Sequence, residues 1–293
     1  TNIYCNINNY KNLSKHIKKI NPEIVFHLAA QPLVIRSYNF PLETIETNIV
    51  GTSNLLKIIK ECKKLKVIII VTSDKCYEAK VEKNYVETDK LGGSDIYSAS
   101  KACTEIISNA FRETYFKNSS IKLATVRAGN VIGGGDFSED RIMPDIIRSH
   151  YFKKDCIIRN QDFIRPWQHI LDPLNGYIKL AEKLYSSNKQ KIKYDCAWNF
   201  GPSGKKRKVI DLVLQAQKYF KIKKIVKKKS NIKETKNLFL NSNKAKKYLA
   251  WRNKINFEKM IKLTSEWYLN YKNKKKIFEL TKKQIIQFEN EKN

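Results

Sequence analysis

The sequence has few acidic residues, few arginines and no long apolar segment. Of its 293 residues, 57 are lysine or arginine and 28 are aspartate or glutamate, so the formal net charge is +29. No apolar run approaches the roughly 20 residues that a helix needs to cross a bilayer. No charged-then-apolar signal stretch opens the chain. We therefore expect a soluble, cytoplasmic protein with a substantial globular core.

The six cysteines show neither close pairs nor metal-ligand spacing. They stand at positions 5, 62, 76, 103, 156 and 196. Disulfide frameworks and zinc sites both need cysteines in closer groups, so we expect neither a disulfide nor a bound metal.

The basic balance raises the question of nucleic-acid binding. The densest basic segment, 204–247, holds 16 lysines or arginines against 2 acidic residues. Only 9 of the 57 basic residues are arginines, whereas base-edge and bidentate phosphate recognition favour arginine. We interpret the excess lysine as a solvated surface and expect no specific nucleic-acid partner.

Apolar strands and amphipathic helices alternate in the first half of the chain. Strands are expected at 23–30, 66–73 and 121–129, and helices between them at 41–64 and 96–116. Continuous apolar strands in this alternation predict a doubly wound parallel sheet covered on both faces, an α/β fold of the Rossmann type.

The second half of the chain is less regular. Helices are expected near 142–152, 173–186, 209–220 and 257–271. We expect residues 1–128, with about 168–200, to form the Rossmann-like domain. Residues 129–167 and 201–293 would then form a smaller substrate-binding lobe.

The stretch VTSDKCYE places polar side chains directly after a buried strand. Ser73, Asp74 and Lys75 follow the aliphatic run 67–71, at the carboxyl end of a strand, where ligands bind in such folds. Downstream, YSASK puts Tyr97 and Lys101 on one face of a helix. An ammonium group near a phenol stabilises the phenolate, so Tyr97 could accept a proton from a substrate hydroxyl. Taken alone, Asp74 and Lys75 also fit an exposed, ion-paired turn.

Several distinctive strings carry a resemblance to a known family. They are HLAAQPLVIRSY, TNIVGT, VTSDKCYE, GGSDIYSASK, VRAGNVIGGGDFSEDRIMPD, IRPWQHILDPLNGY and AWNFGPS. In this order they resemble the extended short-chain dehydrogenase/reductases, also called the NAD-dependent epimerase/dehydratase family. Among these, the Ser-Asp-Lys triplet is similar to that of the CDP-glucose 4,6-dehydratases. The resemblance implies an NAD-dependent hydro-lyase that acts on a CDP-hexose in surface-polysaccharide synthesis, and a homodimer.

The resemblance also implies roles for individual residues. Tyr97, assisted by Lys101 and Ser73, would take the proton of the sugar 4-hydroxyl while hydride passes from C4 to NAD. Asp74 and Lys75 would serve as acid and base in the loss of water, and which of them is the acid stays open. Ala29, Ala30 and Asn48 would face NAD together with Tyr97 and Lys101. The substrate would contact Arg36, Asn130, Arg165 and His169.

One family feature is missing from the sequence. The family places a Gly-x-x-Gly-x-x-Gly turn between its first strand and helix to hold the pyrophosphate, and no such string occurs here. The opening residues resemble the stretch after the family's second strand, so we expect an N-terminally incomplete domain whose activity is in question. A nucleotide-sugar 4-epimerase and a non-catalytic remnant are the alternatives.

Overall fold

The computed structural model describes residues 1–79, 84–186, 192–228 and 239–291. A four-stranded parallel sheet lies at its centre, in the order β1-β2-β4-β9. These strands are β1 (Ile24–His27), β2 (Val67–Val71), β4 (Lys122–Ala128) and β9 (Ala197–Phe200). The predicted α/β fold with a parallel sheet is confirmed.

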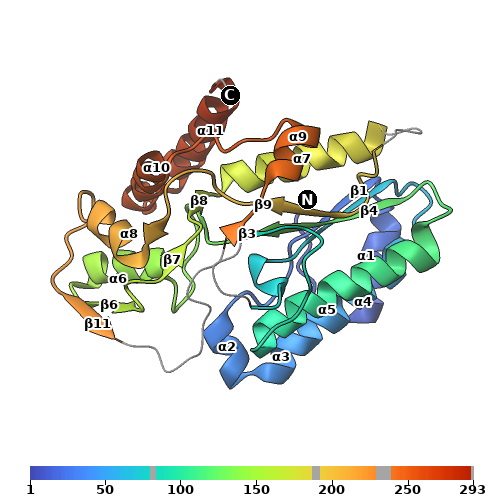
Figure 1. Ribbon diagram of the computed structural model, residues 1–293, viewed down its shortest axis with the longest axis horizontal. Coiled ribbons are helices and arrows are strands. Elements are labelled where there is room, and N and C mark those ends of the chain that lie inside the picture. Colours follow the sequence, from blue (N-terminus) through green and yellow to red (C-terminus); the bar gives the residue numbers. More distant parts are fainter. Residues whose placement is uncertain (80–83, 187–191, 229–238, 292–293) are drawn as a thin grey trace.

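Helices cover both faces of this sheet (Figure 1). They are α1 (Tyr10–Ile20), α2 (Val34–Asn39), α3 (Pro41–Ile45), α4 (Gly51–Ile59) and α5 (Ile96–Phe111) on one side, and α7 (Leu171–Ser186) and α9 (Asn243–Leu249) on the other. The alternation of side chains along β2 explains both layers. Ile68 and Ile70 pack with α4, whereas Val67 and Ile69 pack with α7.

Two of the predicted helices contain a short π-helical stretch. The helix expected at 41–64 consists of α3, a π turn over Glu46–Val50 and α4. The helix expected at 96–116 is α5 followed by a π turn over Arg112–Phe116. The backbone stays in the right-handed helical region across these junctions, so the helical prediction holds apart from the last residues of the first segment.

The remaining elements form a second, smaller unit with its own apolar core. Its helices are α6 (Ile142–Phe152), α8 (Val209–Ala216), α10 (Phe257–Asn270) and α11 (Lys274–Asn290), and its strand pairs are β5 (Val131–Ile132) with β8 (Gln168–His169), β6 (Cys156–Arg159) with β11 (Ile225–Lys228), and β7 (Ile164–Arg165) with β10 (Arg207–Lys208). A short pair, β3 (Asn84–Tyr85) and β12 (Phe239–Leu240), lies beside the main sheet.

The C-terminal part of the chain contributes to both units of the structure. Ala245, Leu249 and Trp251 pack into the core of the main sheet, although they lie within 201–293. The division of the chain into 1–128 with 168–200 and the rest stays a prediction. Within the described residues, no helix is both long and apolar enough to span a membrane.

Candidate active site

Polar residues at the carboxyl end of β2 are buried rather than exposed. Ser73 and Asp74 are 6% and 4% exposed. Ser73 caps the 3-10 turn over Asp74–Cys76 by accepting a hydrogen bond from the Lys75 amide at 3.2 Å, and its hydroxyl donates to Asp74 Oδ1 at 3.0 Å. Burial at this place is inconsistent with an exposed, ion-paired turn.

Helix α5 brings Tyr97 to the same place. Its N-cap, Asp95, accepts a hydrogen bond from the Ser98 amide at 2.9 Å, which fixes Tyr97 in the first turn. The Tyr97 hydroxyl is hydrogen-bonded to the Ser73 side chain. Burial raises the pKa of Tyr97 to about 12; the hydrogen bond with Ser73 and the nearby charge of Arg141 act in the opposite direction.

Lys101 lies one helical turn further along α5. Its side chain is buried, and Nζ donates to the Val71 carbonyl oxygen at the end of β2, at 3.4 Å. Burial lowers the pKa of this ammonium group to about 8. The structure therefore gives Ser73 and Arg141, more than Lys101, as the groups that counteract the effect of burial on Tyr97.

Asp74 is held against the chain of the neighbouring strand. A Cβ atom on Gly129 would lie 2.0 Å from Asp74 Oδ2, so this position tolerates no side chain while Asp74 keeps its place. Burial raises the pKa of Asp74, opposed by the charge of Lys75, the hydrogen bond of Ser73 and the charge of Arg165. A carboxyl group with a raised pKa keeps its proton to higher pH and can act as an acid.

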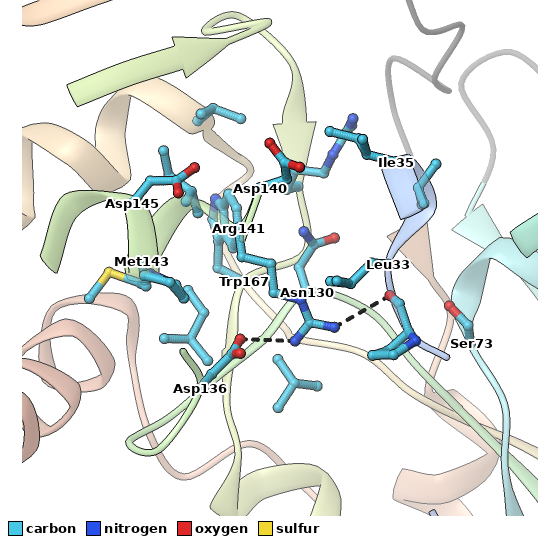
Figure 2. Close-up of a pocket in the computed structure, with 18 of the residues that line it drawn as sticks. Leu33, Ile35, Ser73, Asn130, Asp136, Asp140, Arg141, Met143, Asp145 and Trp167 are labelled. Atoms are coloured by element: carbon cyan, nitrogen blue, oxygen red, sulfur yellow. Dashed lines mark hydrogen bonds and ion pairs between the residues drawn. The ribbon is translucent and has the colours of Figure 1, made fainter. Parts of the chain in front are cut away.

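These residues form one end of a cavity of about 380 Å³. Ser73, Asp74, Lys75 and Tyr97 line it beside residues of the second unit, among them Asn130. Figure 2 shows Ser73 at one side of this cavity and Asp145 at the other. The cavity therefore lies between the sheet and the smaller unit.

The structure brings together most, but not all, of the predicted site residues. Asn130 and Arg165 line the cavity; Asn130 has a positive φ of 40° and Arg165 is 9% exposed. Arg36 and His169 do not line it. Arg36 is exposed and paired with Glu43 at 2.8 Å.

His169 is buried in β8, where burial lowers its pKa to about 4. Asn48 is also buried: its Oδ1 accepts from the Gln31 amide at 2.8 Å and its Nδ2 donates to Ser100 Oγ at 2.9 Å. Asn48 thus fixes the loop that follows Ala29 and Ala30 onto helix α5. Contacts of these residues with a ligand remain predictions.

The sequence analysis missed two arginines that line the cavity. Arg141 donates to Asp136 Oδ2 at 2.9 Å and to the Pro32 carbonyl oxygen at 3.4 Å, as the dashed lines in Figure 2 show. Arg159 pairs with Asp140 at 2.7 Å. With only nine arginines in the chain, their scarcity was a signal that could have drawn attention to both.

Comparison with known proteins identifies the family. The model of the GDP-mannose 4,6-dehydratase family matches residues 1–264. The chain belongs to this family. A CDP-glucose 4,6-dehydratase of Salmonella typhimurium is 44% identical over 214 residues, which cover 71% of this chain and 59% of that protein. A UDP-glucose 4-epimerase of Mycoplasma pneumoniae is 26% identical over 215 residues, 68% of this chain and 61% of that protein.

Solved structures agree on the fold. A dTDP-glucose 4,6-dehydratase from Bacillus anthracis in complex with NAD gives a TM-score of 0.73 at 20% identity, over 95% of this chain and 82% of that one. MoeE5 in complex with UDP-glucuronic acid and NAD gives a TM-score of 0.79 at 19% identity, over 92% of this chain and 85% of that one. The chain spans about three fifths of the length of the Salmonella typhimurium and Mycoplasma pneumoniae proteins.

Proposed function

We propose that this chain carries the active site of an NAD-dependent CDP-glucose 4,6-dehydratase, which forms CDP-4-keto-6-deoxyglucose for surface-polysaccharide synthesis. One observation carries the proposal: Ser73, Asp74 and Tyr97 meet, buried, at the end of a single cavity. The 44% identity to a protein of that name supports the choice of substrate.

The buried ammonium group of Lys101 supports NAD as the cofactor. Lys101 donates a long hydrogen bond, 3.4 Å, to the Val71 carbonyl oxygen, so a second acceptor such as a ribose hydroxyl fits its chemistry. When bound there, NAD would supply the acceptor and later the donor of a hydride. Lys101 and Tyr97 would hold its nicotinamide end, with Asn48 fixing the loop at Ala29 and Ala30.

Tyr97 is the proposed base for the sugar 4-hydroxyl. Its hydroxyl lines the cavity and is hydrogen-bonded to the Ser73 hydroxyl, which can keep a hydrogen bond to the tyrosine oxygen after the proton has moved. A phenol with a pKa of about 12 needs help to give up its proton at neutral pH. The positive charge of Arg141 provides part of that help.

Asp74 is the proposed acid for the departing 6-hydroxyl. Its raised pKa keeps the carboxyl group protonated to higher pH than an ordinary aspartate. Lys75 lines the same cavity and is the proposed base at C5, once the C4 ketone has made that proton acidic. A nucleotide-sugar epimerase shares the need for Tyr97 and Lys101 but not for an acid and a base at C5 and C6.

Asn130 and Arg165 are the proposed substrate-binding residues, and the cavity adds Arg141 and Arg159. Guanidinium groups suit a diphosphate because they form two parallel hydrogen bonds to it. Arg36 and His169 remain proposed contacts, although Arg36 would first have to leave Glu43.

A deuterium label at C4 of the substrate sugar tests the proposed reaction. CDP-glucose deuterated at C4 is incubated with NAD and either the 293-residue chain or a form extended at its N-terminus by a family-like segment of roughly 60 residues that carries the glycine turn. We expect the extended form to produce the 4-keto-6-deoxy sugar with deuterium at C6. Deuterium retained at C4 in CDP-galactose would instead indicate an epimerase, and loss of the label to the medium would contradict internal return.

We also propose that the intact enzyme is a cytoplasmic homodimer. Apolar side chains on α3 and α5 support a second copy as the partner: Leu42 is 70% and Ile106 is 56% exposed. Light scattering tests this. Ile106→Glu should lower the measured mass to that of a monomer, whereas an unchanged mass would place the contact elsewhere.

A further inference from the structure

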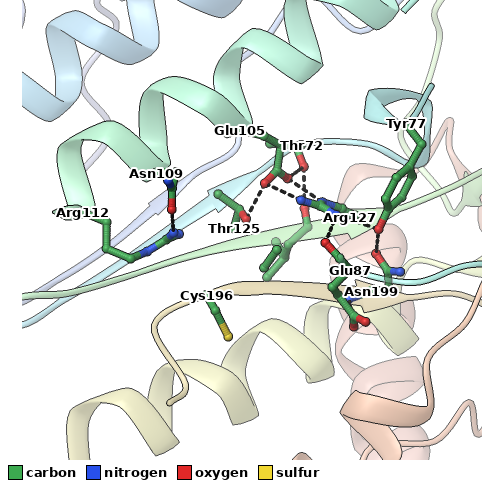
Figure 3. A network of polar contacts seen from close by, with 12 residues as sticks. Thr72, Tyr77, Glu87, Glu105, Asn109, Arg112, Thr125, Arg127, Cys196 and Asn199 are labelled. Atoms are coloured by element: carbon green, nitrogen blue, oxygen red, sulfur yellow. Dashed lines mark hydrogen bonds and ion pairs between the residues drawn. The ribbon is translucent and has the colours of Figure 1, made fainter. Parts of the chain in front are cut away.

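A buried ion pair lies behind the cavity floor (Figure 3). Glu105 of α5 and Arg127 of β4 each have side chains only 3% exposed. Arg127 Nε donates to Glu105 Oε1 and Nη2 donates to Oε2, both at 2.9 Å. This is the two-pronged geometry in which a guanidinium fixes a carboxylate most firmly.

The carboxylate of Glu105 also accepts from two threonines. Thr72 Oγ1 donates to Oε1 and Thr125 Oγ1 donates to Oε2, the latter at 2.7 Å. Thr72 directly precedes Ser73, and Thr125 lies on β4. One side chain of α5 is therefore tied to the carboxyl end of β2 and to β4.

Arg127 extends the network to two further segments. Its Nη1 donates to the Tyr77 hydroxyl at 2.6 Å and to the Glu87 carbonyl oxygen at 3.1 Å. Tyr77 in turn donates to Asn199 Oδ1 on β9 at 2.8 Å. Figure 3 shows this chain of contacts running from Glu105 through Arg127 to Asn199.

Glu105 stands on the helical face that also carries the proposed catalytic side chains. Tyr97, Lys101 and Glu105 are spaced by four residues, so Glu105 follows Lys101 by about 6 Å along the helix axis. Neither Glu105 nor Arg127 lines the cavity. Any effect they have on the reaction must therefore pass through other residues.

Stability alone is a poor reason for such a pair. A buried ion pair contributes little net stability, because apolar residues of similar volume often pack as well or better. The pair instead restricts α5 to one position, since the carboxylate has to meet donors from β2 and β4 at once.

We propose that the Glu105–Arg127 pair is a positioning unit: it sets the rotation and height of α5 that present Tyr97 to Ser73 and Lys101 to the end of β2. This inference rests on the proposed function, because it concerns the side chains that serve the proposed reaction.

The charge of Glu105 has a second effect, on Lys101. The ionisable groups that face Lys101 are His27 of β1, Cys76 of the turn after β2, and Glu105. Burial and the charge of Lys101 lower the pKa of His27 to about 4, and burial raises that of Cys76, so both are neutral near pH 7. Glu105 thus supplies the negative charge that counteracts the effect of burial on Lys101.

NMR of the folded 293-residue chain tests the proposal without turnover. The ε-carbon resonance of Lys101, assigned by its loss in Lys101→Met, gives the titration midpoint. The ring resonances of Tyr97, assigned with Tyr97→Phe, report its surroundings. The variants are Glu105→Gln and the double variant Glu105→Leu with Arg127→Met, which removes both charges and keeps the volume.

The matched control is Glu113→Gln. Glu113 lies further along the same helical segment, is exposed and pairs with Lys117 at 3.4 Å, so the substitution removes the same charge outside the network. We expect it to leave both resonances as in the wild type.

In the pair variants we expect the Lys101 midpoint to fall from about 8 by on the order of one pH unit. The Tyr97 ring resonances should move as well. If Glu105→Gln does not fold because Arg127 is left unpaired, the double variant alone decides. A folded variant in which either the Lys101 midpoint or the Tyr97 resonances remain at wild-type values overturns the proposal.

Failure of this inference can be separated from failure of the proposed function. Shifted resonances in a protein that forms no 4-keto-6-deoxy sugar would support the positioning role of the pair and contradict the proposed reaction. Deuterium transfer to C6 together with unchanged resonances would support the proposed reaction and contradict the positioning role.

Discussion

Tyr97 is placed to act as a base, although its pKa is high. Its hydroxyl lines the cavity and is hydrogen-bonded to Ser73, whereas burial raises its pKa to about 12. In the proposed reaction the proton can leave only when positive charge and a hydrogen bond stabilise the phenolate.

Replacing Tyr97 by phenylalanine should therefore affect the reaction and not the binding. In the extended form, Tyr97→Phe should lower turnover of CDP-glucose about 10² to 10⁴-fold, the usual contribution of a general base. The affinity for CDP-glucose, measured by calorimetry, should change less than about threefold, because the ring still fills its place. Turnover within a factor of ten of the wild type would assign the base to another residue.

Asp74 should act later in the reaction than Tyr97. In Asp74→Asn we expect formation of the 4-keto-6-deoxy sugar to slow by about 10² to 10⁴-fold, while the C5 proton of the sugar still exchanges with deuterium oxide, as NMR would show. In the wild type the rate of water loss should fall as pH rises through the raised pKa of Asp74, since the acid form is then lost. Loss of C5 exchange in Asp74→Asn would instead place this carboxyl in the earlier step.

Helix α7 carries a buried carboxylate at its beginning, next to the sheet. Asp172 is fully buried; its Oδ1 accepts from the Lys254 amide at 2.8 Å, and its Oδ2 has no hydrogen-bond partner among the residues that the structure describes. Burial raises the pKa of Asp172 to about 6, against the hydrogen bonds from the backbone. A helix N-terminus favours a negative charge, but here the loss of solvation is the larger effect.

The stability of the protein should therefore depend on pH through Asp172. Its folded-state pKa is above the unfolded value of about 3.9, so its favourable contribution is present at low pH and is lost as pH rises through about 6. Asp172→Asn should raise the free energy of unfolding at pH 8 by on the order of 3 kcal/mol, and by about half as much at pH 5, measured by urea unfolding.

Asp211→Asn provides the comparison for this variant. Asp211 also lies in the first turn of a helix, α8, and accepts from the Lys208 amide at 2.9 Å, but at the surface. Its substitution removes a carboxylate from the first turn of a helix without changing the buried core. An Asp172→Asn variant that raises the free energy of unfolding by the same amount at pH 5 and pH 8 would contradict the prediction.

The charge of the whole molecule predicts weak and unselective binding to nucleic acid. With a net charge of +29 and only nine arginines, phosphate contacts should come mainly from lysines. We expect binding to a labelled single-stranded oligonucleotide, followed by fluorescence anisotropy, to weaken at least about tenfold between 50 and 200 mM salt. Sequence-selective binding that persists at 200 mM salt would contradict the interpretation of this charge as a solvated surface.

Local patterns in the sequence determined the main sheet and the proposed catalytic floor. The apolar run 67–71 predicts a buried strand, the polar residues after it mark the ligand-binding end, and the spacing of Tyr97 and Lys101 places both on one helical face. The structure confirms the strand, the helix and the parallel order, because periodicities of two and 3.6 residues depend on short segments only.

The tertiary structure alone decided which distant charges meet. Arg36, Arg127 and Arg141 look alike in the sequence, yet Arg36 pairs at the surface with Glu43, Arg127 is buried against Glu105, and Arg141 lines the cavity. These differences arise from how strands and helices pack, and no local pattern encodes that packing. A long basic side chain is compatible with all three environments, and the free energy of each depends on the partner that folding places beside it.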